Sequence, residues 1–188
     1  MQIRKAEIQE YHKVREFYYT LTDAMKDAEY GPGWKKDIYP SQEFLRGSIE
    51  SGELYIGECD GKIIACMVLN HESNEGYQKV QWSVEANDSE VFVIHALGVH
   101  PAFSGKGVAK QMVRSVIELA QANQIKTIRL DVLKGNLPAE KAYTKIGFVC
   151  LDTIPMYYED TGWTDYEVFE YIVSWLDPKE EQNDLYNR

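Results

Sequence analysis

The chain has 188 residues, a length typical of one domain with a substantial hydrophobic core. Its composition, with 44% hydrophobic and 12% aromatic residues, excludes an intrinsically disordered protein. The formal net charge of −10 argues against a nucleic acid partner, because phosphates would be repelled.

No apolar run approaches the roughly 20 residues that a membrane-spanning helix needs, so no membrane partner is expected. The first residues are charged and lack the apolar segment of a secretory signal, which predicts a cytoplasmic protein. Cys59, Cys66 and Cys150 form no CxxC pair and no cluster with the four histidines. They are expected to be reduced thiols in the core, and no metal site is predicted.

The N-terminal third is predicted to be helical. Apolar residues recur at three- and four-residue spacings over residues 7–28, which indicates a helix with one buried face. The glycines and proline of residues 31–34 end that pattern. A shorter helix is expected after Pro40, with Ser41 as its N-cap.

The next segment is predicted to form strands. Residues 53–70 read as a β-hairpin that turns at Asp60-Gly61. Residues 77–82 fit either a short strand or a loop. Residues 90–99, EVFVIHALGV, are β-branched and apolar, which is typical of a buried central strand.

Helices and strands alternate in the second half. An amphipathic helix is predicted over residues 105–122, followed by a strand over residues 127–133. Asn136 is expected as the N-cap of another helix, with Pro138 in its first turn and Gly147 at its end.

The chain is predicted to close with two more strands, one starting at Phe148 and one over residues 166–173. The element order predicts a single layered α/β domain over residues 1–176. Residues 177–188 are expected to form a polar C-terminal tail.

A glycine-containing loop, SGKGVA at residues 104–109, stands where the predicted helix begins. Glycine inside a helix costs about 1 kcal/mol relative to alanine, so another requirement is expected here. N–H groups at a helix N-terminus lack internal partners and attract phosphate when no side chain crowds them. Taken alone, the loop fits equally well a glycine-rich turn with Ser104 as an ordinary N-cap. Its spacing matches neither GxxxxGK[ST] nor GxGxxG.

A second motif lies downstream, with elements Asn136, Ala139, Tyr143, Gly147 and Phe148. Together the loop and this motif resemble the GNAT superfamily of acyl-CoA-dependent N-acetyltransferases. Members carry Arg/Gln-x-x-Gly-x-Gly/Ala after the fourth strand and then Asn-x-x-Ala-x-x-x-Tyr-x-x-x-Gly-Phe. The second pattern is complete here.

The first pattern departs at one position, where Ser104 stands in place of Arg or Gln. The resemblance implies phosphate contacts mainly through backbone N–H groups, so acyl-CoA binding is expected to survive, with a weaker affinity as the alternative. The resemblance implies the GNAT fold. This is an α/β fold with a mixed, mostly antiparallel, twisted central sheet flanked by helices, in which the fourth and fifth strands splay apart.

The resemblance also implies an acyltransferase enzyme that transfers an acetyl group from acetyl-CoA directly to a primary amine. The amine belongs to a small molecule or to a peptide or protein. The cosubstrate is expected between the splayed strands, paired with Leu97 and Val99, with its pyrophosphate on residues 104–109. The implied cofactor-binding residues are Leu97, Gly98, Val99, Ser104, Gly105, Lys106, Gly107, Val108, Ala109, Asn136 and Tyr143.

For catalysis, Tyr143 is the expected acid or hydrogen-bond donor to the leaving sulfur. Some family members use a fourth-strand glutamate as base, but this chain has Val93 there. His95 shares a strand face with that position, and an ordinary pKa near 6.5 makes it a candidate base. The alternatives are a hydrogen-bonded histidine in the cleft wall, with Glu90, Asp131 or a water chain as base.

The acceptor site is expected in the variable segments. Their candidate aromatic residues are Trp34, Tyr39, Tyr77, Trp82, Tyr157 and Tyr158. Glu159, Asp160 and Asp165 are either attractors of a cationic amine or a solvated acidic loop. Dimerisation is common in the family, and the aromatic C-terminal strand is a candidate surface for a homodimer.

Two other functions stay open from the sequence. One is an acyl-CoA-binding GNAT-like module with a sensory or structural role and little transferase activity. The other is a nucleotide-binding protein, which fits the loop but not the second motif.

Overall fold

The computed structural model describes residues 1–174. The predicted tail, residues 177–188, and the last two residues of the predicted domain lie outside the described residues. Within residues 1–174 each helix is too short or too polar to span a membrane.

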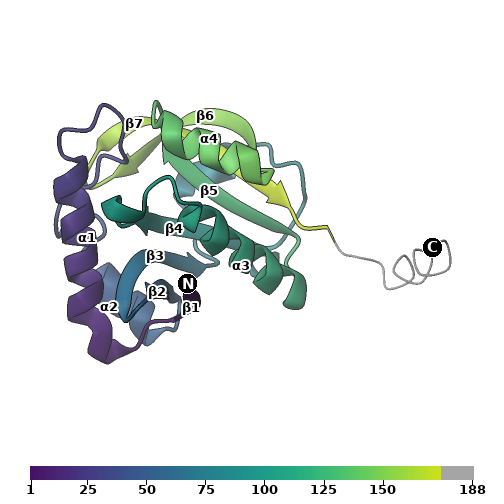
Figure 1. Cartoon of the computed structure of the whole chain (residues 1–188). Coiled ribbons are helices and arrows are strands. Elements are labelled where there is room, and N and C mark those ends of the chain that lie inside the picture. The colour runs from purple at the N-terminus through teal and green to yellow at the C-terminus, as the bar shows by residue number, and fades with distance from the viewer. Residues whose placement is uncertain (175–188) are drawn as a thin grey trace.

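A seven-stranded sheet runs through the molecule in the order β1-β2-β3-β4-β5-β7-β6 (Figure 1). Every neighbouring pair is antiparallel except β4 and β5, which are parallel. The predicted mixed, mostly antiparallel sheet is confirmed. The strands are β1 Gln2–Lys5, β2 Leu54–Cys59, β3 Lys62–Asn70, β4 Val91–Val99, β5 Thr127–Leu133, β6 Val149–Tyr158 and β7 Gly162–Ile172.

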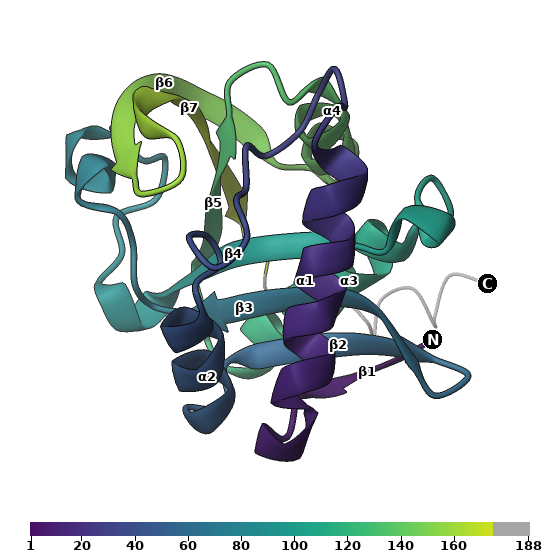
Figure 2. The same ribbon diagram turned by 90° about the vertical axis from the view of Figure 1, so that its left-hand side faces the viewer.

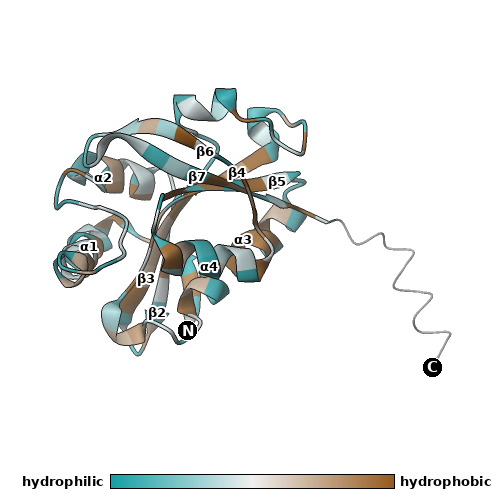
Figure 3. Ribbon diagram, turned by 90° about the horizontal axis from the view of Figure 1, so that it is seen from above, coloured by the Kyte–Doolittle hydropathy of each residue, from teal (hydrophilic) through white to brown (hydrophobic). Residues whose placement is uncertain are grey.

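In the described part of the chain, four α-helices cover the two faces of this sheet (Figures 2 and 3). α1 (Tyr11–Met25) and α2 (Gln42–Glu50) pack on one face of β2, β3 and β4. α3 (Val108–Ala122) and α4 (Leu137–Ile146) lie on the other face. Short 3₁₀ helices complete the described part: Ile8–Glu10, Glu75–Lys79, Asp88–Glu90 and Pro101–Phe103.

The largest hydrophobic core lies between α3 and the sheet, with Met112 and Val113 fully buried against β3, β4 and β5. A second core forms under α1, where Val14 and Tyr18 pack on β2 and β3. Hydrophobic residues accordingly gather on the central strands (Figure 3). The sheet is therefore held from both sides close to the point where β4 meets β5.

Local signals in the sequence explain several boundaries. Ser41 Oγ accepts a hydrogen bond from Phe44 N at 3.0 Å, which confirms Ser41 as the N-cap of α2. Asp60 and Gly61, with φ of 50° and 73°, adopt the left-handed conformation that a tight hairpin turn requires. Gly147 ends α4 with a φ of 116°.

Other expectations need correction. β1 was not predicted, because two of its four residues are charged and none is buried, and α1 begins at Tyr11 rather than residue 7. Residues 75–79 form a 3₁₀ helix and no strand. The late strand is the second arm of a long β6–β7 hairpin. Of the cysteines, Cys66 is buried, whereas Cys150 is exposed.

Candidate functional site

A cleft opens where β4 and β5 separate. The two strands pair through three residue pairs only, the last being Val93 with Arg129. β4 nevertheless continues to Val99 and β5 to Leu133. The predicted splay is thereby confirmed. The cleft is lined by Pro32, Trp34, Tyr39, Ile94, His95, Ala96, Leu97, Asp131, Val132, Leu133, Asn136, Ala139, Tyr143, Tyr158, Asp160 and Tyr166.

A β-bulge in β4 accompanies the splay. The pairing register of β3 and β4 shifts here. The segment from His95 to Gly98 on β4 contains one residue more than the segment of β3 that it opposes. The extra residue is Ala96, whose φ of 48° is left-handed and unusual for alanine. Tyr18 of α1 donates a hydrogen bond to Ala96 O at 2.7 Å and holds the bulge in place.

Leu97 and Val99 present backbone polar groups on the open side of β4. Gly98 pairs with β3, and just beyond it His100 N donates to Ile64 O at 2.8 Å. Alternation along an antiparallel strand then directs the N–H and C=O groups of Leu97 and Val99 away from β3. Because β5 has diverged there, these groups face the cleft and can bind an extended chain.

Gly98 has a packing reason of its own. A Cβ at this position would lie 2.5 Å from the Leu21 side chain of α1. The glycine lets α1 approach β4 closely, while its own polar groups face β3.

The loop before α3 is shaped by its glycines. Gly105 and Gly107 have φ of 73° and 78°, so both are left-handed, and α3 begins at Val108 rather than residue 105. A Cβ at either glycine would meet no atom within 4 Å. Glycine is therefore required at these two positions by the left-handed backbone conformation and not by internal packing. The space beside both glycines is open.

The N-terminus of α3 carries free donors. Gly107 is its N-cap and supplies no side-chain hydrogen bond, so the expectation of Ser104 as an ordinary N-cap is wrong. Ser104 instead follows the 3₁₀ helix Pro101–Phe103. The first helical bond runs from Gln111 N to Gly107 O, which leaves the N–H groups of residues 108–110 without helical acceptors.

The other loop residues differ in exposure. Ser104 and Lys106 are exposed, and Lys106 Nζ lies 5.1 Å from the centre of the Phe103 ring. Val108 is buried under the loop and Ala109 is half-buried. Backbone groups and the exposed cation of Lys106 thus form this end of the site.

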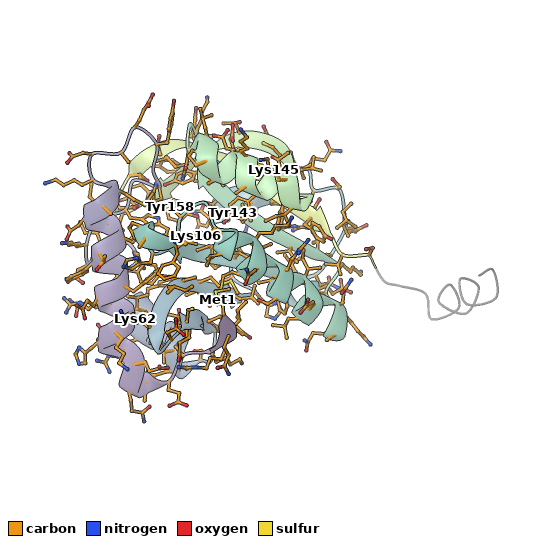
Figure 4. The ribbon with its side chains drawn as sticks, in the orientation of Figure 1. Met1, Lys62, Lys106, Tyr143, Lys145 and Tyr158 are labelled. Atoms are coloured by element: carbon orange, nitrogen blue, oxygen red, sulfur yellow. The ribbon has the colours of Figure 1, made fainter. Side chains whose placement is uncertain are left out.

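α4 supplies two polar groups to the cleft. Asn136 is the N-cap residue of α4, but its side chain makes no capping hydrogen bond. Tyr143 packs its ring against Phe148 and Phe169, at centroid distances of 5.6 and 6.3 Å. Burial raises the pKa of Tyr143, and the nearby charge of Asp131 adds to the effect. Its phenol is therefore neutral and able to donate. Figure 4 labels Tyr143 beside Tyr158 of β6.

Asp131 is the most perturbed carboxyl group of the cleft. It lies on β5, and Tyr77 and Tyr158 both donate hydrogen bonds to its Oδ2 at 2.9 Å. Burial raises the pKa of Asp131 to about 6, although the two hydroxyls act in the opposite direction. Such a group changes protonation near neutral pH, which is the property of a general acid or base.

His95 lies in the cleft wall with its Nε2 already engaged. Asn70 Oδ1 and Glu72 O lie 2.9 and 3.1 Å from Nε2, so the proton is assigned to this nitrogen. Burial lowers the pKa of His95 to about 4. The ring is therefore neutral near pH 7 and a weak proton acceptor. Glu90 does not line the cleft and forms an ion pair with Lys126 at 2.9 Å.

The predicted acceptor residues divide into two groups. Trp34, Tyr39 and Tyr158 line the cleft, and Tyr77 supports Asp131 from behind. Tyr157 is exposed, as expected for ordinary surface.

Trp82 lies outside the cleft, where the centre of its ring is 4.1 Å from Cζ of the Arg129 guanidinium. Of the three acidic residues considered with the aromatic set, Asp160 alone lines the cleft. Glu159 is exposed, and Asp165 pairs with Lys134 at 3.1 Å.

The family model described as the acetyltransferase (GNAT) family matches residues 13–148. The chain belongs to the GNAT acetyltransferase family. It is accordingly an acyltransferase enzyme, and the family match favours this assignment over a nucleotide-binding protein.

Individual relatives agree with this assignment. A 52-residue segment is 40% identical to a ribosomal protein bS18-alanine N-acetyltransferase from Haemophilus ducreyi. This match covers 28% of the chain and 36% of the length of that relative.

Solved structures agree in fold. A GNAT family acetyltransferase from Streptococcus agalactiae has a TM-score of 0.76 at 19% identity, covering 92% of this chain and 95% of its own. The structure of yncA from Salmonella typhimurium contains its cofactor acetyl-CoA. It has a TM-score of 0.67 at 15% identity, covering 94% of this chain and 96% of its own.

Several site residues of this GNAT protein escaped the sequence analysis. Tyr18 fixes the bulge from α1, Asn70 orients His95 from β3, and Tyr166 lines the cleft from β7. No local pattern marks them, because each acts on a partner in a different element. Only the fold brings them together.

Proposed function

We propose that this chain transfers an acetyl group from acetyl-CoA to a primary amine of a small molecule, peptide or protein. One observation carries the proposal: a single cleft joins the unpaired edge of β4, Tyr143 and the half-buried carboxyl group of Asp131. The first group can bind an extended donor, and the other two can move protons.

On the donor side, the free backbone groups of Leu97 and Val99 would pair with the pantetheine arm as an added strand does. The open N–H groups at the start of α3 would accept the pyrophosphate, with Gly105 and Gly107 giving it access. Asn136, whose side chain is not used for capping, would bond to the same arm.

Acetyl-CoA supplies the acetyl group as a thioester. The acceptor must be neutral to attack, so a group in the cleft has to take its proton. Asp131 is the base we favour, because at pH 7 it is mostly ionised yet its pKa of about 6 lets it hold a proton. As the carbon–nitrogen bond forms and the carbon–sulfur bond breaks, Tyr143 donates its phenolic proton to the leaving sulfur.

Two further groups take part in the proposal. The N–H of Leu97 faces the cleft and would donate to the carbonyl oxygen as negative charge develops there. His95 stays a candidate base, although its lowered pKa and its engaged Nε2 favour a positioning role in the cleft wall.

The acceptor class is the open part of the proposal. The name of the Haemophilus ducreyi relative supports a protein α-amine, but that match covers only 36% of the relative. The cleft itself supports an amine that enters between the Trp34–Tyr39 segment and the β6–β7 turn.

The first test is calorimetric titration of acetyl-CoA into the protein and into Gly107→Glu. We expect micromolar binding by the native protein and at least a tenfold loss in the variant, because its carboxylate would occupy the phosphate position. A Glu118→Gln variant, which changes an exposed side chain in the second half of α3, serves as the control.

The outcomes separate the candidate functions. Binding together with thiol release on addition of amines supports the transferase. Binding without thiol release for any amine would favour the GNAT-like binding module. Absence of binding would contradict the proposal, and Ser104→Arg would then show whether the departure at this position is the cause.

A further inference from the structure

Asp160 stands out among the groups that the proposed reaction does not use. It lies in the turn between β6 and β7, is 4% exposed, and lines the cleft. Its Oδ1 is buried and has no hydrogen-bond partner within residues 1–174. A buried acceptor without a partner costs about 1–3 kcal/mol, and more when it is charged. Such a group indicates a ligand that satisfies it.

The turn that carries Asp160 is held firmly against the α1–α2 connection. Lys35 Nζ donates to the backbone O of Asp160 at 2.5 Å. A Cβ on Gly33 would lie 2.9 Å from the side chain of Thr161, so the two loops are in close contact. Thr161 Oγ1 also forms a hydrogen bond with Tyr166 OH at 2.7 Å. The backbone that carries the Asp160 side chain is thus anchored to the α1–α2 connection and to β7.

The charge of the cleft points to a cation. Among the described residues, those that line the cleft include two carboxyl groups, Asp131 and Asp160, and no Lys or Arg. His95, the remaining titratable base, is neutral because burial lowers its pKa to about 4. Lys35 bonds to the backbone of Asp160 and forms no ion pair with its carboxylate within the described residues. A ligand carboxylate would find no cationic partner among the lining residues.

The aromatic wall of the cleft has the same preference. Tyr39 contacts Trp34 and Tyr158 at centroid distances of 6.1 and 5.9 Å, and Tyr158 contacts Tyr166 at 4.9 Å. All four rings line the cleft. Aromatic faces attract ammonium and guanidinium groups and give no such attraction to anions.

We propose that Asp160 binds a second cationic group of the acceptor, so that the preferred acceptors are primary amines carrying another ammonium or guanidinium group. The inference rests on the proposed function, in which Asp131 serves the amine that reacts. Free α-amino acids are disfavoured by the same geometry, because their carboxylate would lie beside two others.

The test begins with binding, which does not depend on transfer. Calorimetric titrations with 1,4-diaminobutane and with butylamine, in the presence of coenzyme A, compare a dication with a monocation of equal carbon number. The native protein is expected to bind the diamine about tenfold more tightly or better, the effect of one charged hydrogen bond. Asp160→Asn should remove that difference and leave butylamine affinity unchanged.

Matched variants guard against a structural effect. Glu159→Gln removes the same charge from the exposed neighbouring position and should behave as the native protein. Asp160→Glu keeps the charge and should retain the preference for the dication. Melting temperatures of all three variants report whether the turn still folds, and the comparison of the two amines on the native protein needs no variant.

A steady-state arm identifies the source of the cation. KM for the diamine is measured beside KM for the peptide amides Ala-Arg and Ala-Ala. If Asp160→Asn raises KM for the diamine selectively, the acceptor is a small polyamine-like molecule. If it raises KM for Ala-Arg alone, the acceptor is a basic peptide. Equal binding of both amines by the native protein, or equal weakening of both in Asp160→Asn, would overturn the inference. Selective binding without thiol release would instead contradict the proposed function alone.

Discussion

At the scale of single residues, Asp131 has opposing effects on folding and on chemistry. Its pKa of about 6 lies above the ordinary value of 3.8 because burial disfavours the ionised carboxylate. The folded chain therefore binds this proton more tightly than the unfolded chain does. Stability falls as pH rises from about 4 to about 6, and the whole penalty is present at pH 7.

The first prediction follows from this fall in stability with rising pH. Asp131→Asn should raise the free energy of unfolding at pH 7 by up to about 3 kcal/mol, the equivalent of the pKa difference. It should also lower kcat/KM strongly and remove its decline below about pH 6. Urea unfolding at pH 7 and at pH 4 checks this, because the stability difference should vanish at the lower pH. A variant less stable than the native protein at pH 7 would contradict it.

Tyr143 is expected to act through its hydroxyl alone. Tyr143→Phe keeps the ring contacts with Phe148 and Phe169, so the melting temperature should hardly change. The loss of a positioned proton donor should lower kcat about 100-fold with little effect on KM for acetyl-CoA. Steady-state kinetics beside Tyr157→Phe, an exposed tyrosine outside the cleft, gives the comparison. A fall in kcat of less than threefold would assign Tyr143 to packing.

At the scale of elements, the segment between β3 and β4 is fastened to the sheet by one buried ion pair. Arg129 Nε on β5 lies 3.1 Å from Glu170 Oε1 on β7. Glu170 also accepts from Ser83 N at 2.7 Å, and Arg129 donates to Val84 O at 3.0 Å. The pair therefore joins two strands to the loop that carries Tyr77, one of the two tyrosines that donate to Asp131.

Removal of one partner of this ion pair should lower the free energy of unfolding substantially. Glu170→Gln leaves the Arg129 charge without its counterion and is expected to destabilise the fold by about 3 kcal/mol. Asp165→Asn removes an exposed ion pair with Lys134 and should change stability by less than about 1 kcal/mol. Urea denaturation of both variants measures the contrast. Equal losses of stability in the two variants would show that burial does not make the Arg129–Glu170 ion pair more important than the Lys134–Asp165 pair.

Elements with local signals were predictable, and those that depend on distant partners were not. The Ser41 cap, the Asp60-Gly61 turn and the end of α4 at Gly147 each follow from a few adjacent residues. β1 has no pattern of its own and exists because β2 pairs with it. The start of α3 was misplaced because helix periodicity continues back through Gly105 and Gly107, whose left-handed φ values the periodicity does not report.

The same division applies to the site. Residues proposed for the acyl donor fall within 91–147, where motif spacing fixes them in sequence. The proposed acceptor side joins residues 34–39 to residues 158–166, more than 100 positions away, and only the fold reveals that contact. Asp131 was one of several candidate bases, because its raised pKa comes from burial that no short pattern encodes.

At the scale of the whole molecule, three residue pairs between β4 and β5 join the two parts of the sheet. Beyond Val93 and Arg129, the two parts are joined by α3, which packs on strands of both, and by contacts such as that of Lys35 with the β6–β7 turn. An extended ligand between the strands would add hydrogen bonds where the ladder stops. The bound protein should thus behave as a more continuous sheet than the free protein.

This continuity can be measured. Acetyl-CoA at 100 times its dissociation constant should stabilise the fold by about 2.7 kcal/mol. Amide hydrogen exchange at Leu97 and Val99 should slow, because their N–H groups face the open side of β4. Gly98, whose polar groups already face β3, should change little. Uniform protection along β4 would contradict the proposed strand-like pairing.

The turn at residues 159–161 also bears on how such an enzyme can change its substrate. Its Asp160 lines the proposed acceptor side of the cleft, and the turn lies outside the stretch proposed to hold the acyl donor. A few substitutions in this turn would alter which amine is selected while the donor side and the proton-transfer groups stay intact. The fold thereby separates the turn proposed to select the acceptor from the groups proposed to carry out the transfer. Exchange of this turn between relatives is a practical route to new acceptors.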